Sequence, residues 1–165
     1  MIIVHGGQTG VDRGAHDGAL DNGWSIAGFM PQNGRDEIGP IPFEVYSQLQ
    51  RCLIPGNAAR TELNIEKAHA VLVVVPDKDD PYATPGTRLT LLEARRKGVP
   101  RFVTQPDDAI GMLVSFVAQH ELRTGGELRL MVAGPRASRW SSGQIETAGL
   151  LRRLKHALDA KGRTA

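Results

Sequence analysis

Short apolar runs rich in β-branched residues alternate with helix-like segments along the whole chain. This alternation is typical of a parallel sheet whose strands are connected by helices that cover both faces. We therefore predict an α/β fold with a Rossmann-like, doubly wound, mainly parallel sheet. The predicted strands are Ile2–Val4, Ser25–Phe29, Ala70–Val75, Val99–Thr104 and Leu128–Val132.

Helical periodicity and glycine punctuation place five helices between and after these strands. Glycines directly follow two of the predicted helices, at Gly23 and Gly98, where a left-handed cap is expected. The last helix is amphipathic, with its leucines on one face and its basic residues on the other. The predicted helices are Asp12–Asn22, Ala58–Ala68, Thr87–Lys97, Ala109–Glu121 and Gln144–Ala160.

A chain of 165 residues is long enough for one domain with a sizeable core and too short for two comfortable ones. We expect a single Rossmann-like domain over residues 1–160 and a frayed tail over 161–165. The segment Pro31–Gly56 is rich in proline and glycine and shows little periodicity. Because loops of this length are usually functional or disordered, we interpret it as an ordered flap over a site.

The segment 5–14, with the sequence HGGQTGVDRG, connects the first predicted strand to the first predicted helix. Gly6, Gly7 and Gly10 let the backbone turn sharply and let a ligand come close to it. The following helix directs its free N–H groups and the positive end of its dipole to the same place, which favours a phosphate site. The alternative is a tight connection in which Thr9 is the helix N-cap.

The spacing of these glycines matches neither of the common phosphate loops. A dinucleotide fingerprint has the pattern G-x-G-x-x-G, whereas this turn has G-G-x-x-G. A Walker loop has Lys followed by Ser or Thr after its glycines, and Asp12 and Arg13 stand there instead. The turn alone is weak evidence for a ligand, and the case rests on similar turns elsewhere in the chain.

Two later turns, over residues 83–88 and 134–143, also follow predicted strands and precede helices. Because the carboxyl ends of parallel strands meet at one edge of a sheet, we expect the three turns to converge on one crevice. Arg136 and Arg139 in the last turn are either an exposed, solvated pair or two guanidinium groups that each bind two oxygens of a phosphate. The turns also carry the hydroxyls of Thr9, Thr84, Thr87, Ser141 and Ser142. The combination predicts a polyanion pocket.

Composition limits the partners. The formal net charge is +2, with 20 Lys and Arg against 18 Asp and Glu, so neither nucleic acid nor a membrane surface is favoured. The single cysteine, Cys52, excludes an internal disulfide, and no leader-like segment precedes the first strand, so we expect a cytoplasmic protein. The histidines lack metal-site spacings, so no protein-held metal is predicted. We expect a small-molecule ligand and a homo-oligomer, a dimer or a tetramer.

Four motifs in this order resemble the molybdenum cofactor (molybdopterin) carrier family over essentially the whole chain. They are Gly6-Gly7-Gln8-Thr9-Gly10-Val11-Asp12-Arg13, Arg60-Thr61-Glu62-x-Asn64, Gly86-Thr87-x-x-Thr90 and Val132-Ala133-Gly134-Pro135-Arg136. That family is similar in fold to the lysine-decarboxylase-like, cytokinin-activating phosphoribohydrolases. The resemblance implies a nucleotide-binding or phosphate-binding Rossmann-like protein that carries or stores a molybdenum cofactor.

The resemblance implies binding rather than catalysis, with no catalytic residue assigned. We expect Ala at Arg13 or Arg136 to weaken anion binding with little change in melting temperature. The predicted cofactor-binding residues are Gly7, Gln8, Thr9, Gly10, Arg13, Arg60, Gly86, Thr87, Gly134 and Arg136.

The hydrolase relatives supply an alternative, a nucleoside 5'-monophosphate phosphoribohydrolase. Their turn is followed by a glutamate that acts on the ribose, and Thr90 occupies that place in this chain. Because cleavage of a glycosidic bond needs a carboxylate near the oxocarbenium charge, Glu62 or Asp12 would have to substitute. A further alternative is a regulatory module that senses a nucleotide.

Overall fold

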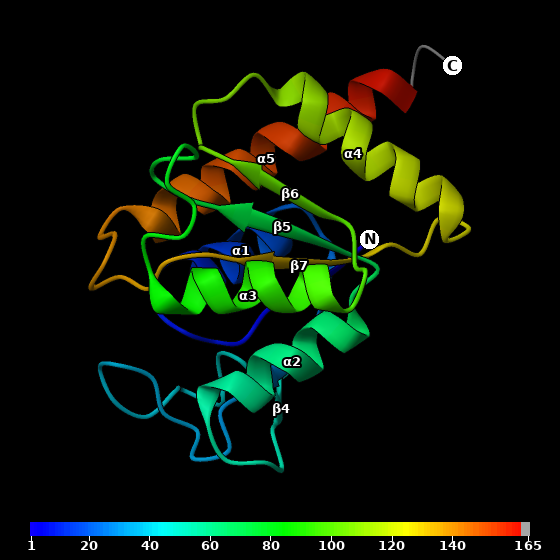
Figure 1. Cartoon of the computed structure of the whole chain (residues 1–165). Coiled ribbons are helices and arrows are strands. Elements are labelled where there is room, and N and C mark those ends of the chain that lie inside the picture. The colour runs from blue at the N-terminus through cyan, green and yellow to red at the C-terminus, as the bar shows by residue number, and fades with distance from the viewer. Residues whose placement is uncertain (163–165) are drawn as a thin grey trace.

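The computed structural model describes residues 1–162, which form an α/β fold built around a five-stranded sheet (Figure 1). The strand order is β2-β1-β7-β5-β6, and all neighbouring strands run parallel. This architecture confirms the predicted fold class. The strands of the sheet are β1 (Ile2–Val4), β2 (Ser25–Ala27), β5 (Ala70–Val74), β6 (Arg101–Thr104) and β7 (Arg129–Ala133).

Helices cover both faces of the sheet. One core cluster joins α1, α4 and α5 to one face, and a second joins α2 and α3 to the other. All five residues of β5 are buried, as expected for an inner strand covered on both sides. The helices are α1 (Val11–Asp21), α2 (Asn57–Lys67), α3 (Pro85–Arg96), α4 (Ile110–Arg123) and α5 (Gly143–Gly162).

The strand predicted over Ser25–Phe29 is wrong in its second half. The chain leaves the main sheet at Gly28, where φ is 138° and a side chain would meet the His5 carbonyl oxygen at 2.1 Å. After this break, β3 (Phe29–Met30) pairs in parallel with β4 (Gln50–Arg51) in a separate two-stranded sheet. The close approach of two backbones, which only glycine permits, therefore separates the two strands.

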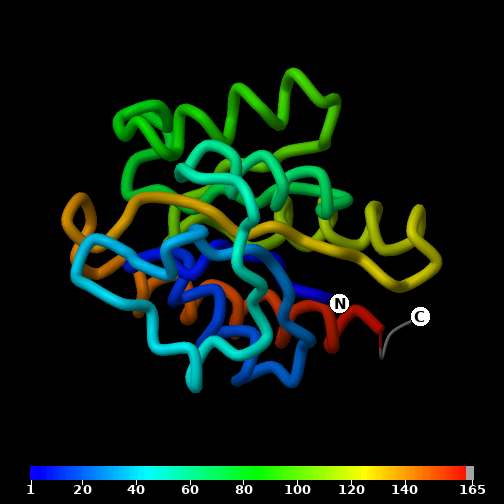
Figure 2. Tube along the Cα trace, turned by 90° about the horizontal axis from the view of Figure 1, so that it is seen from below, coloured from blue at the N-terminus to red at the C-terminus, as the bar shows by residue number. Residues whose placement is uncertain are grey.

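The proline-rich segment 31–56 packs beside the carboxyl edge of the sheet. It buries a small core of its own, in which Met30 packs with Ile41, Tyr46 and Leu49. Figure 2 shows its first half next to the loop that follows β7, and hydrogen bonds from Ser138 to Glu37 connect the two. The segment is therefore held against the loops that end the strands.

Helix α5 continues through the first two residues of the segment 161–165 that we expected to fray, and residues 163–165 lie outside the described part. Every helix within residues 1–162 is too short or too polar to cross a lipid bilayer.

Candidate functional site

A crevice opens at the carboxyl edge of the sheet, where β7 and β5 lie side by side. The helices that follow these two strands, α5 and α3, go to opposite faces, so their loops diverge. Such a point is where open α/β sheets bind ligands. The crevice has a cavity volume of about 290 Å³, which we call cavity 1. It is lined by Gln8, Asp12, Arg60, Thr61, Thr84, Pro85, Gly86, Thr90, Met131, Ala133, Gly134, Arg136, Ser138 and Arg139.

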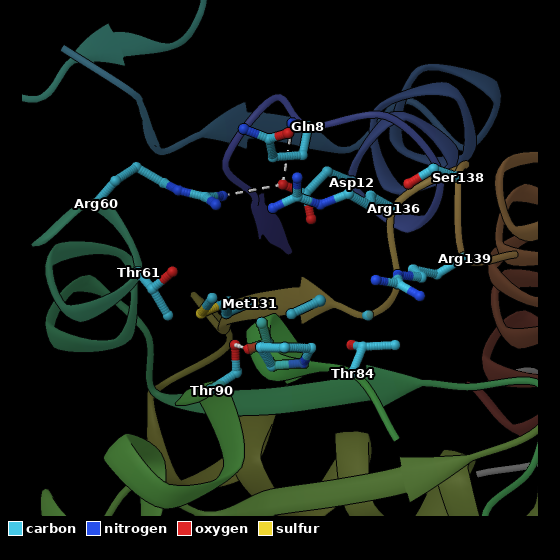
Figure 3. Close-up of a pocket in the computed structure, with 14 residues that line it drawn as sticks. Gln8, Asp12, Arg60, Thr61, Thr84, Thr90, Met131, Arg136, Ser138 and Arg139 are labelled. Atoms are coloured by element: carbon cyan, nitrogen blue, oxygen red, sulfur yellow. Dashed lines mark hydrogen bonds and ion pairs between the residues drawn. The ribbon is translucent and has the colours of Figure 1, made fainter. Parts of the chain in front are cut away.

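Three arginines make cavity 1 basic. Arg60 comes from α2, whereas Arg136 and Arg139 come from the loop after β7 and face it across the cavity (Figure 3). Asp12 is the single carboxylate among the described residues that line cavity 1, so its walls carry an excess of positive charge. The buried Nε of Arg60 has no hydrogen-bond partner within residues 1–162. Guanidinium groups from two sides suit an anion with several oxygens.

The Asp12 carboxylate organises the first glycine-rich turn. Its Oδ2 accepts hydrogen bonds from the N–H groups of Gly6 (3.1 Å) and Gln8 (3.2 Å) and from Nη1 of Arg60 (3.2 Å). Burial raises the pKa of Asp12, while the charge of Arg60 and the two N–H donors oppose this rise. Two of the N–H groups that we expected to face a phosphate are thus bonded to an internal carboxylate.

Close packing of the loops accounts for one of the glycines and for Thr9. Gly10 has a φ of 74°, and a side chain there would meet the Pro135 carbonyl oxygen at 2.6 Å. The alternative in which Thr9 is the N-cap is wrong, because Gly10 is the cap of α1. The Thr9 hydroxyl instead donates to Glu37 and accepts from the Ala137 N–H at 3.1 Å. Thr9 therefore connects three loops and is not a helix cap.

A second cavity of about 330 Å³, cavity 2, lies between the segment 31–37 and the start of α2. It shares Gln8 and Arg136 with cavity 1. Burial would raise the pKa of Glu37, but hydrogen bonds from Ser138 and Thr9 outweigh it and lower that pKa. The lining consists of Gln8, Pro31, Gln32, Asn33, Arg35, Asp36, Glu37, Pro55, Gly56, Asn57 and Arg136.

Half of the predicted binding residues line cavity 1, namely Gln8, Arg60, Gly86, Gly134 and Arg136. Thr87 lies just outside, in a smaller neighbouring cavity, and its N–H is capped by the Thr84 hydroxyl at 3.3 Å.

The other four predicted residues, Gly7, Thr9, Gly10 and Arg13, line neither cavity 1 nor cavity 2. Arg13 points into the segment 31–56, where it pairs with Asp36 and lies over the Tyr46 ring. Ser141 and Ser142 also lie outside both linings.

The predicted binding residues omit Thr61 and Thr90, although both belong to the motifs of the resemblance, and they omit Asp12, which was considered as a substitute acid. Thr61 follows Arg60 in α2, so its place depends on how that helix meets the sheet. Arg139 was signalled by its position in the same loop as Arg136. Within residues 1–162, no group of three or more His, Cys, Asp or Glu side chains could hold a metal ion.

Comparisons with known proteins agree with this architecture. The family model described as "Circularly permutated YpsA SLOG family" matches residues 3–155. The chain is similar to a protein in a crystal structure from Syntrophus aciditrophicus SB, described as "Putative molybdenum carrier protein". The two sequences are 25% identical, the structures superpose with a TM-score of 0.77, and the match covers 93% of each chain. No curated protein gives a significant match.

The sheet order is that of a circularly permuted dinucleotide-binding sheet. If the chain started at β7, its main-sheet strands would lie in the order 3-2-1-4-5, which begins the classic dinucleotide-binding order. In this order the loop that carries Arg136 and Arg139 follows the first strand.

Proposed function

The chain belongs to the circularly permuted YpsA SLOG family, and on this premise we propose that cavity 1 binds a phosphate-bearing small molecule. The observation that carries the proposal is the arrangement of Arg60, Arg136 and Arg139 on two sides of a cavity at the carboxyl edge of the sheet. The molybdenum cofactor is the first candidate, because the similar solved structure is described as a molybdenum carrier. The protein would then carry or store this cofactor.

The residues present fit such a ligand. The cofactor supplies a phosphate and an oxomolybdenum group, both of which are oxygen-rich anions. Arg136 and Arg139 would hold one anion, and Arg60, whose buried Nε has no hydrogen-bond partner within residues 1–162, lies on the opposite side of the cavity. Cavity volumes of about 290 and 330 Å³ are close to the lower end of the roughly 300–1,000 Å³ typical of small-molecule sites.

A carrier role is favoured over hydrolysis because the candidate catalytic carboxylates are either engaged in internal contacts or absent from the lining of cavity 1. Oδ2 of Asp12 already accepts three hydrogen bonds, and Glu93 is paired with the exposed Arg96. Glu62 does not line cavity 1. A phosphoribohydrolase would have to use Asp12, so this activity is the second candidate. Nucleotide sensing and assembly into a dimer or tetramer remain predictions.

The first experiment is native mass spectrometry of the purified protein, followed by denaturing release and molybdenum analysis. We expect a co-purifying phosphate-bearing ligand, with the pterin and the metal present in equal amounts if it is the molybdenum cofactor. Arg136→Ala combined with Arg139→Ala should reduce the retained ligand at least tenfold, since each charge-assisted hydrogen bond contributes about 1.5–3 kcal/mol.

Arg123→Ala is the matched control, because Arg123 is an exposed arginine at the end of α4. Full retention of ligand by the folded double variant would contradict the proposal. Release of free base from an added nucleoside 5'-monophosphate, abolished by Asp12→Asn, would instead establish the hydrolase.

A further inference from the structure

Gln8 stands between the two cavities with an unsatisfied polar atom. The residue is 7% exposed, and its Oε1 has no hydrogen-bond partner within residues 1–162. In Figure 3 its amide lies beyond the Asp12 carboxylate as seen from Thr84 and Thr90. An unpaired buried acceptor costs free energy, so its retention at a shared cavity wall points to a ligand that donates to it.

The two cavities differ in charge. In cavity 1, three arginines face one carboxylate among the described residues. In cavity 2, Arg35 and Arg136 face Glu37, because the Asp36 carboxylate is already paired with Arg13, so this cavity is basic but less so than cavity 1. An anionic group is therefore favoured more strongly in cavity 1 than in cavity 2.

Cavity 2 also has backbone donors. Helix α2 begins at Asn57 after Gly56, without a side-chain cap among the described residues, and both residues line the cavity. The N–H groups of the first turn of a helix have no partner inside the helix. A group with a carbonyl oxygen beside an N–H would match these donors together with the Gln8 acceptor.

We propose that cavity 2 holds the uncharged heterocycle of the ligand whose phosphate lies in cavity 1, and that Gln8 Oε1 accepts a hydrogen bond from a ring N–H. The ligand class is a phosphate ester of a ring with a carbonyl next to N–H donors, a chemistry that guanine and pterin share. This inference rests on the proposed function, which requires only the phosphate in cavity 1.

The test compares probes that share a phosphate but differ in the ring. Isothermal titration calorimetry measures the dissociation constants of ribose 5-phosphate, GMP and neopterin monophosphate. We expect GMP or neopterin monophosphate to bind at least tenfold more tightly than ribose 5-phosphate. A preference for one of the two ring compounds distinguishes a nucleotide source from a pterin source.

Two variants of the same residue test the acceptor. Gln8→Leu should reduce the preference for the ring compound about tenfold or more, because the ring N–H loses its partner. Gln8→Glu keeps an acceptor oxygen, so the preference should survive, and any effect of the new charge on the phosphate cancels in the ratio. Both variants keep the backbone N–H that bonds to Asp12.

The outcomes separate this inference from the proposed function. An unchanged preference in Gln8→Leu overturns the acceptor role of Gln8. Wild-type protein that binds all three probes equally overturns the heterocycle site and leaves phosphate binding intact. Failure of the wild type to bind any of the three probes overturns both. If Gln8→Leu does not fold, loss of the preference in Gln8→Glu would overturn the acceptor role by itself.

Discussion

Among single residues, Arg13 has a structural contact where its motif predicted a ligand contact. Its motif neighbours suggested a phosphate ligand, but the guanidinium pairs with Asp36 and lies 5.7 Å from the centre of the Tyr46 ring. The Asp36 side chain is fully buried, and its other oxygen accepts from the N–H groups of Ile38 and Gly39. Arg13 therefore holds the segment 31–56 in place.

This position reverses the effect that the sequence predicted for Arg13→Ala on stability. We now expect the free energy of unfolding to fall by about 3 kcal/mol, because a buried carboxylate loses its partner. Chemical denaturation measures this change. Arg35→Ala, which removes an exposed arginine beside Asp36, is the control and should change stability by less than about 0.5 kcal/mol. Equal stability of the two variants would contradict this role.

At the scale of elements, α1 packs against α5 through glycines. A side chain at Gly14 would meet the Gln144 carbonyl oxygen at 2.3 Å, and one at Gly18 would meet Leu151 at 2.9 Å. Spaced four residues apart, these glycines form one smooth face of α1. The two helices thus approach closely enough to align the loops after β1 and β7, whose residues share cavity 1.

Two glycine-to-alanine substitutions separate helix propensity from packing. Gly14→Ala should reduce the free energy of unfolding by roughly 2 kcal/mol or more, because the new methyl group forces the helices apart. Gly149→Ala on α5 should raise the free energy of unfolding by up to about 1 kcal/mol. A methyl group there would lie at an ordinary contact distance of 3.8 Å from an Arg152 nitrogen. Thermal unfolding compares them, and a stabilised Gly14→Ala would refute the packing argument.

At the scale of the whole molecule, a buried histidine pair connects the sheet, α1 and the segment 31–56. The Gly7 N–H donates to Nδ1 of His5, which leaves Nε2 to donate to Nδ1 of His16 at 3.2 Å. Tyr46 packs on the His16 ring with centroids 4.6 Å apart. Burial, with the charges of His16 and Arg60, lowers the pKa of His5 to about 3, and burial also lowers the pKa of His16.

These shifts predict a loss of stability in mild acid. In the unfolded chain His5 takes up a proton below a pKa of about 6.5, whereas in the folded chain it does not until the pH approaches 3, so stability falls as the pH falls between these values. From pH 7.5 to 5.5 the loss should be about 1.4 kcal/mol for His5, and the lowered pKa of His16 acts in the same direction. Urea unfolding at both pH values measures this loss.

The raised pKa of Asp12 changes stability with pH in the opposite direction. Histidine variants are therefore needed to isolate the contribution of the histidines. His16→Gln should reduce the pH dependence, and replacement of the exposed His156 by Gln should leave it as in the wild type. A slope unchanged by His16→Gln would show that His16 is not responsible.

Much of the site could be predicted, because it follows from local rules. Strands that run parallel end at one edge, so the loops carrying Gln8, Gly86 and Arg136 had to converge. The use of each side chain could not be predicted. Whether an N–H group of the first turn meets a ligand or Asp12 depends on Arg60, which lies 48 residues away in the sequence.

The layered α/β class and the edge at which a site would form follow from the amino-acid sequence alone, since strand runs and helical periodicity are local properties. Three features depend on the folded arrangement: β7 lies between β1 and β5, Gly28 ends the main-sheet strand, and Gln8 lines both cavities. Strand order, backbone approach and burial depend on contacts between distant segments, and no local pattern encodes their relative free energies.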